Sequence, residues 1–159
     1  MYGIIATWRM ALEGISKADS MLKNNESAAD SIEEAIKAVE DFEYYKSVGY
    51  GGLPNEEMEV ELDAAFMDGD TLEFGCVGGV KDFANPVSIA RSLMHYDANN
   101  FLIGQGAEKY ASRHGFERKT MLTDRAKIHY HNRTKEITNT ELKPYSGHDT
   151  VGMVCLDTA

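Results

Sequence analysis

The feature that most constrains the fold of this chain is the alternation of short apolar strands with helices that carry one apolar face. Residues 2–7 are rich in β-forming residues and predict a first strand. Two helices with apolar residues at helical spacing follow, and these residues are Ala11, Ile15, Ala18 and Leu22, then Ala28, Ile32, Ala35 and Val39. Because such helices bury their apolar faces against other elements, we predict an α/β or α+β fold.

The second of these helices has a clear start. Residues 24–26 form a turn before Ser27, which can cap the helix, and Asp30 stands at the third helical position. The face opposite the apolar stripe is charged. We interpret it as a solvated surface, and it carries Glu33, Glu34, Lys37 and Glu40.

The middle of the chain predicts a hairpin after a glycine-rich bend at 47–55. Apolar and acidic residues alternate over 60–66, which is typical of a strand with one buried face. A second strand follows, in which Leu72, Phe74 and Cys76 point one way. Asp68-Gly69-Asp70 lies between the two strands and is a favourable hairpin turn.

The next elements predict two helices separated by a strand. Asn85-Pro86 begins a helix, because proline suits the first helical position. Residues 101–104 predict a short strand, and residues 105–114 predict a helix that Gly115 ends.

The last part of the chain is polar before it becomes apolar again. Thr123 can cap a polar helix, and residues from about 131 to 147 predict a polar linker. Residues 150–156 form a β-type run of the buried kind. A sheet needs partners or a cover at its edges, so we expect the functional protein to continue beyond Ala159.

Charge and cysteine content narrow the classes of function. Lys and Arg number 16 and Asp and Glu 26, which gives a net charge of −10. So acidic a chain repels phosphate backbones and anionic lipid, and we expect neither a nucleic-acid nor a membrane partner.

The N-terminal residues and the cysteines bear on cellular location. Residues 1–10 lack the basic start and cleavage site of a signal peptide. Cys76 and Cys155 lie far apart and form no CxxC pair, so the sequence favours a reducing, cytoplasmic location.

Two glycine-rich motifs resemble nucleotide-binding loops but lack essential residues. Gly104-Gln-Gly106 lacks the third glycine of a dinucleotide fingerprint, because Lys109 occupies that position. We interpret it as a tight strand-to-helix turn. Residues 75–79 are not followed by the lysine of a phosphate loop. We therefore predict no nucleotide cofactor.

Three other residue types could carry chemistry. His129 and His131 have no evident third ligand, so we predict exposed polar positions and no metal. Cys155 lies in an apolar run without an adjacent base and is interpreted as a buried small hydrophobe. Trp8 stands at the end of the first strand, where it can serve either the core or a ligand.

The most informative segment is Gly147-His148-Asp149-Thr150-Val151-Gly152, where a polar stretch runs into a strand. One interpretation is a capped turn before the strand. The other is self-cleavage before Thr150. A threonine hydroxyl needs a base, and scission would give Thr150 a free α-amino group with a pKa of about 8. That amine could accept the proton of its own hydroxyl, which is a self-sufficient hydrolase nucleophile.

The sequence resembles the glycosylasparaginases (aspartylglucosaminidases), members of the N-terminal-nucleophile hydrolases, along nearly its whole length and in order. The matching segments are Ala6-Thr7-Trp8, Ser47-Val-Gly-Tyr-Gly-Gly-Leu-Pro-Asn55, Val60-Glu-Leu-Asp-Ala-Ala-Phe-Met-Asp68, Asn85-Pro-Val-Ser-Ile-Ala-Arg91, Gly104-Gln-Gly106, His114-Gly-Phe116 and His148-Asp-Thr-Val-Gly-Met153. Leu53 and Asn55 depart from residues that some of these enzymes carry, which leaves specificity open.

The resemblance implies a four-layer αββα sandwich made from one precursor that cuts itself into two subunits. Residues 1–149 would correspond to the α subunit and residues 150–159 to the start of the β subunit, the remainder of which is missing. Thr150 would be the nucleophile, and His148 and Asp149 would form the precursor side of the cut. Ser47 would contact the amine of the nucleophile, and Trp8 would line the substrate pocket.

The implied activity is hydrolysis of the side-chain amide of N4-(β-N-acetylglucosaminyl)-L-asparagine, without cofactor or metal. The resemblance also implies a dimer of αβ units. Two alternatives remain open. One is an isoaspartyl peptidase/L-asparaginase of the same fold, and the other is an inert fragment that needs the missing half.

Overall fold

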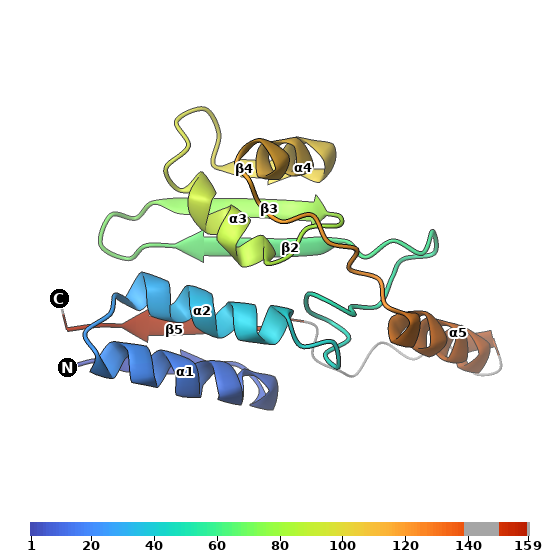
Figure 1. The fold of residues 1–159 in the computed structure, drawn as a ribbon, viewed down its shortest axis with the longest axis horizontal. Helices are drawn as coiled ribbons and strands as arrows, with labels where there is room; N and C mark the ends of the chain where they lie inside the picture. Colours follow the sequence, from blue (N-terminus) through green and yellow to red (C-terminus); the bar gives the residue numbers. More distant parts are fainter. Residues whose placement is uncertain (139–149, 159) are drawn as a thin grey trace.

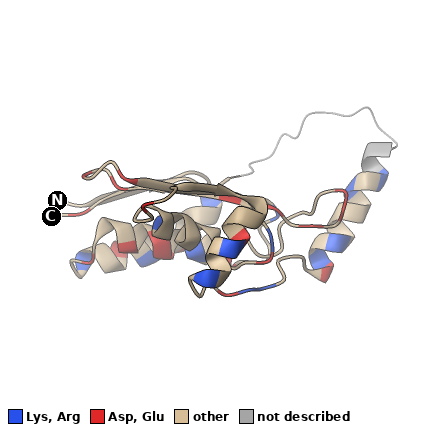
Figure 2. Cartoon of the chain, turned by 90° about the horizontal axis from the view of Figure 1, so that it is seen from above, with Lys and Arg blue, Asp and Glu red and all other residues tan. Residues whose placement is uncertain are grey.

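A computed structural model describes residues 1–138 and 150–158 of the chain, with the side chains of 136–138 excepted. Its elements form one layer of sheet and one layer of helices (Figures 1 and 2). The elements are, in chain order, β1 (Gly3–Ala6), a 3-10 turn (Arg9–Ala11), α1 (Leu12–Lys23), α2 (Ala28–Glu40), β2 (Leu62–Met67), β3 (Phe74–Val80), α3 (Pro86–Leu93), β4 (Phe101–Ile103), α4 (Gly104–Arg113), α5 (Asp124–Thr138) and β5 (Met153–Leu156). The predicted mixed helix-and-sheet class is confirmed.

The described strands form two sheets. β1 and β5, the first and last strands, pair antiparallel with Ala6 opposite Met153. β2 pairs antiparallel with β3, and β4 pairs parallel with β3 on its other edge. Helices α1 to α4 lie on one side of these sheets, whereas α5 extends away from them (Figure 2).

The helix starts follow the local signals in the sequence. The Ser27 hydroxyl accepts a hydrogen bond from the Asp30 N–H at 3.0 Å and caps α2. Thr123 caps α5 in the same way, through the Ala126 N–H at 3.2 Å. Pro86 occupies the start of α3, as predicted.

The hairpin between β2 and β3 is confirmed, with one correction. The Asp68 carboxylate accepts hydrogen bonds from the N–H groups of Asp70 and Thr71, which fixes the turn. Leu72 is part of this turn rather than of the strand, with a φ of 60° and a side chain that is 67% exposed. The longer turn delays the strand to Phe74.

The main core lies between β2, β3 and the helices α3 and α4. Its buried members are Phe66, Val77, Val80, Phe83, Val87, Ile89, Ala90, Leu93, Ala107, Tyr110 and Ala111. Gly75 lets α3 approach β3 closely, because a Cβ at this position would lie 2.0 Å from the Ala90 carbonyl oxygen.

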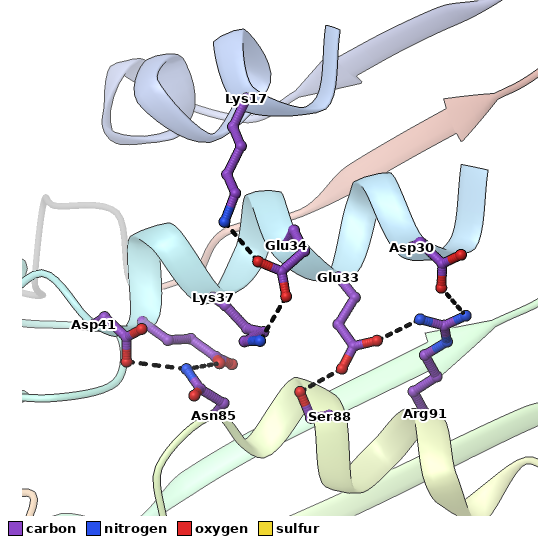
Figure 3. A network of polar contacts seen from close by, with 10 residues as sticks. Lys17, Asp30, Glu33, Glu34, Lys37, Asp41, Asn85, Ser88 and Arg91 are labelled. Atoms are coloured by element: carbon purple, nitrogen blue, oxygen red, sulfur yellow. Dashed lines mark hydrogen bonds and ion pairs between the residues drawn. The ribbon is translucent and has the colours of Figure 1, made fainter. Parts of the chain in front are cut away.

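The charged face of α2 is not the solvated surface that the sequence predicts. α2 lies between α1 and α3, and α3 covers part of that face (Figures 1 and 3). Glu40 is only 3% exposed. The α2–α3 junction that results is polar, and we define it by Asp30, Glu33, Glu40, Asn85, Ser88 and Arg91.

The side of the sheets away from the helices is apolar and exposed. We call it the open sheet face. Its large side chains are between 45% and 69% exposed, and they are Ile5, Met67, Phe74, Phe101, Ile103, Val154 and Leu156. The final strand is therefore apolar as predicted, but its outward side chains are exposed in the described part of the chain.

Two boundaries near the end differ from the prediction. Helix α5 continues to Thr138, so the predicted linker cannot start near residue 131. Strand β5 begins at Met153 rather than at Thr150. None of the helices in the described ranges is long and apolar enough to cross a membrane.

Candidate active site

Strand pairing brings the two ends of the chain together at the candidate site. Because β1 and β5 run antiparallel, the end of β1 meets the start of β5. The pairing extends one step beyond the strands, where the Thr7 N–H donates to the Gly152 carbonyl at 2.9 Å. Thr150 is exposed and precedes β5, at the end of the ladder where the chain leaves β1 through Trp8.

Trp8 adopts a backbone conformation that non-glycine residues rarely occupy. Its φ is 64° and its ψ is 153°, and its side chain is 48% exposed. Such a conformation costs on the order of 1–3 kcal/mol and persists only where the surroundings enforce it. Hydrogen bonds on both sides do so here, from Thr7 to Gly152 and from the Ala11 N–H to the Trp8 carbonyl. Of the two predicted roles for Trp8, the exposed position favours contact with a ligand.

Ser47 lies in the glycine-rich loop that follows α2, and the backbone of Glu40 holds this loop. The Tyr50 N–H donates to the Glu40 carbonyl at 2.7 Å. Gly49 has a φ of +60°, and a Cβ there would lie 2.1 Å from the same carbonyl oxygen, so only glycine fits. Among the described residues, no hydrogen bond joins Ser47 to Thr150, and the predicted role of Ser47 stays a prediction.

Glu40, whose backbone holds this loop, carries a buried carboxyl that the sequence analysis interpreted as solvated. One carboxylate oxygen accepts from the Val87 N–H at 3.2 Å in the first turn of α3, and the other lies 3.4 Å from the Asn85 side-chain nitrogen. Burial raises the pKa of Glu40 to about 7. A signal was present in the sequence, because Glu40 follows Ile32 and Ile36 at four-residue spacing on the apolar side of α2.

The remaining candidates have simpler surroundings. His148 and Asp149 lie outside the described residues. Cys155 is half-buried rather than buried, and its desolvation, followed by the nearby Asp157, raises the pKa of its thiol, which disfavours the nucleophilic thiolate. His129 and His131 both lie on α5, and the described ranges contain no group of three or more His, Cys, Asp or Glu side chains that could hold a metal ion.

Comparison with known proteins gives the family of this chain. The family described as asparaginase matches residues 6–159, from the end of β1 to the end of the chain. The chain belongs to the asparaginase family. The predicted resemblance is thereby confirmed.

The relatives carry several names. The chain is 32% identical over 154 residues to an N(4)-(beta-N-acetylglucosaminyl)-L-asparaginase of Elizabethkingia miricola, covering 97% of this chain and 45% of the relative. It is 36% identical to an isoaspartyl peptidase/L-asparaginase of Rattus norvegicus, covering 91% and 45%. It is 37% identical to a plant-type L-asparaginase of Thermococcus kodakarensis, covering 76% and 35%. The chain thus spans less than half the length of these relatives.

Proposed function

We propose that this chain is the nucleophile-bearing part of an amidohydrolase that activates itself by scission between Asp149 and Thr150. The observation that carries the proposal is the pairing of β5 with β1, which brings Gly152, two residues after exposed Thr150, against Thr7, the residue before Trp8. A nucleophile at a strand end, next to an exposed aromatic side chain, can meet a ligand from solvent.

Scission and catalysis use the same hydroxyl. In the first step the Thr150 hydroxyl attacks the Asp149 carbonyl carbon, and the amide nitrogen leaves as the α-amine of Thr150. Water then hydrolyses the ester between Asp149 and Thr150. The free amine, with a pKa of about 8, accepts the proton of the hydroxyl in every later turnover.

The proposed substrate is N4-(β-N-acetylglucosaminyl)-L-asparagine. Thr150 attacks its side-chain amide carbonyl, the amino sugar leaves, and water releases aspartate from the β-aspartyl ester. In the cleaved protein, Trp8 would line the pocket and Ser47 would contact the newly formed amine of Thr150. The name of the Elizabethkingia relative, which matches along nearly the whole of this chain, supports this substrate.

A second substrate class is favoured by a different relative. Identity to the rat isoaspartyl peptidase/L-asparaginase is 36%, higher than the 32% to the glycosylated-asparagine enzyme. The second candidate function is therefore hydrolysis of β-aspartyl peptides or asparagine by the same Thr150 chemistry.

The open sheet face supports a proposal about the rest of the protein. Exposed patches of this kind mark interaction surfaces. We infer that a second sheet and helix layer, supplied by polypeptide beyond residue 159, covers this face and completes a four-layer αββα sandwich. The complete unit would then pair as a dimer of αβ units in the cytoplasm.

Mass spectrometry of the complete gene product tests the proposal directly. We expect scission between Asp149 and Thr150, and we expect Thr150→Ala to remain intact and inactive. Comparing turnover of the glycosylated asparagine with that of a β-aspartyl dipeptide then separates the two substrate classes. An intact wild-type chain that hydrolyses neither amide would contradict the proposal and favour an inert fragment.

A further inference from the structure

Thr7 contacts the segment of chain that directly follows Thr150. Besides the Thr7 N–H that donates to the Gly152 carbonyl, the Gly152 N–H donates to the Thr7 hydroxyl oxygen at 2.8 Å. The hydroxyl lies 3.4 Å from the Gly152 carbonyl oxygen, to which it can donate in turn. One residue, through its backbone N–H and its hydroxyl, thus bonds both backbone groups of Gly152.

This contact extends the ladder between β1 and β5 by one pair. A regular antiparallel pair would use two backbone carbonyls as acceptors. At this position the second acceptor is the Thr7 hydroxyl, next to the point where the positive φ of Trp8 turns the chain away from the sheet. A threonine side chain therefore continues the pairing where the backbone of β1 departs.

The contact matters because the ladder is short. β1 and β5 pair over four residues each. At the far end of β5, the Asp157 carboxylate accepts from the Ala28 N–H at 2.7 Å, at the N-terminus of α2. Thr7 and Asp157 thus hold the two ends of β5. Once the bond before Thr150 is broken, such noncovalent contacts set the register of β5, and a slip of one residue would invert its faces.

We propose that Thr7 is a positioning residue: its hydroxyl fixes Gly152 and thereby places Thr150 beside Trp8. The proposal rests on the proposed function, in which Thr150 is the nucleophile. Thr7 acts through Gly152 and does not itself meet the substrate. Its loss should affect the chemical step, because displacing a nucleophile by about 1 Å can reduce a rate on the order of a hundredfold.

The test compares Thr7→Val with Thr7→Ser in the complete gene product. Valine keeps the shape and β-branching of threonine but lacks the hydroxyl, whereas serine keeps the hydroxyl. We expect Thr7→Val to slow scission before Thr150 and to lower kcat by at least about tenfold, with KM changed less than threefold. Thr7→Ser should restore both rates to near the wild-type values.

Thr123→Val is the matched control for a merely structural effect. It removes a threonine hydroxyl that accepts from a backbone N–H at the start of α5, a helix that extends away from the sheets (Figure 2). We expect it to lower the melting temperature without changing kcat or scission.

The outcomes separate the two proposals. If the wild type splits and turns over, and Thr7→Val retains kcat within twofold, the role of Thr7 is wrong and the proposed function stands. If Thr7→Ser fails to restore kcat, the hydroxyl is not the determinant and the role of Thr7 is again wrong. If the wild type neither splits nor hydrolyses, the proposed function fails, and the positioning role fails with it.

Discussion

The α2–α3 junction and the open sheet face reverse the usual distribution of side chains. At the junction, charged groups are paired and, apart from exposed Asp30, partly or fully covered: Arg91 bonds to both Glu33 and Asp30, and Glu33 also accepts from the Ser88 hydroxyl (Figure 3). On the open sheet face, large apolar side chains are exposed. Buried charges must be paired, as those of the junction are, whereas exposed apolar patches mark interaction surfaces.

The Asp30 and Glu34 carboxylates illustrate the paired state of α2. Hydrogen bonds from the Ser27 hydroxyl, and then from Arg91, lower the pKa of Asp30. Hydrogen bonds from Lys17, and then from Lys37, lower the pKa of Glu34. Each carboxylate thus stabilises the fold above its ordinary pKa and loses that contribution as the pH falls.

The strongest test of the comparison places the same substitution on the two faces of β3. Gly75→Ala faces α3, where the new Cβ would meet the Ala90 carbonyl, and we expect it to lower the free energy of unfolding by about 3 kcal/mol. Gly78→Ala faces away from the helices, and the nearest atom to its new Cβ would be in Ile103, at 3.4 Å. We expect it to change the free energy of unfolding by less than about 0.5 kcal/mol. Urea denaturation of the 159-residue chain measures both. Equal effects would show that the two faces are equally covered.

The next test removes one buried partner from the junction. Glu40→Ala leaves the Val87 N–H without its acceptor in the interior, and we expect a loss of about 2–3 kcal/mol in the free energy of unfolding. Glu40→Gln keeps an acceptor oxygen at the same place and should cost less than half as much. A Glu40→Ala variant as stable as the glutamine variant would contradict the role of the junction in stability.

The raised pKa of Glu40 also gives the junction a pH dependence. In the folded protein this carboxyl takes up a proton at about pH 7, whereas in the unfolded chain it does so near its ordinary value. The folded state therefore binds more protons between about pH 4.5 and 7, so the stabilisation is present at low pH and is lost as the pH rises.

From pH 5 to pH 7 the loss of this stabilisation by Glu40 lowers the free energy of unfolding by about 2 kcal/mol. Asp30 and Glu34 act with the opposite sign, but their contributions change mainly below about pH 4.5. Denaturation at several pH values should show the decline in the wild type and its disappearance in Glu40→Gln. A wild type and glutamine variant with parallel profiles would be inconsistent with protonation of Glu40 in this range.

The smallest expected effect on stability comes from the open sheet face. Ile103→Lys should change the unfolding free energy of the 159-residue chain by less than about 0.5 kcal/mol, because the side chain is exposed. The same change should reduce self-association of the chain, measured by analytical ultracentrifugation, because it interrupts the apolar patch. Self-association that Ile103→Lys leaves unchanged would show that the chains associate through another surface.

The sequence predicted those features that depend on neighbouring residues. The caps at Ser27 and Thr123 and the turn at Asp68 each involve hydrogen bonds over two or three residues, and all three are confirmed. Leu72 was misplaced because the turn is longer than its first three residues suggest. Glu40 was misplaced although its spacing from Ile32 and Ile36 puts it on the apolar side of α2, because its partner Val87 in α3 lies far along the chain.

At the candidate site, too, the sequence predicted what short local motifs mark and missed a contact between distant residues. Trp8, Ser47 and Thr150 could be proposed because an ordered set of short motifs marks them. Thr7 stands within one of these motifs, yet its contact to Gly152 spans 145 positions and depends on the register of two strands. Pattern alone gives no access to that register, because β1 and β5 are short and both mostly apolar.

The antiparallel pairing of β1 and β5 has a practical consequence for labelling. Gly3 lies opposite Leu156, at the end of the ladder remote from Trp8. A strand of four residues extends about 13 Å. A fluorophore or affinity tag fused ahead of Gly3 would therefore emerge at least a full strand length from Thr150, clear of the reaction that we propose there.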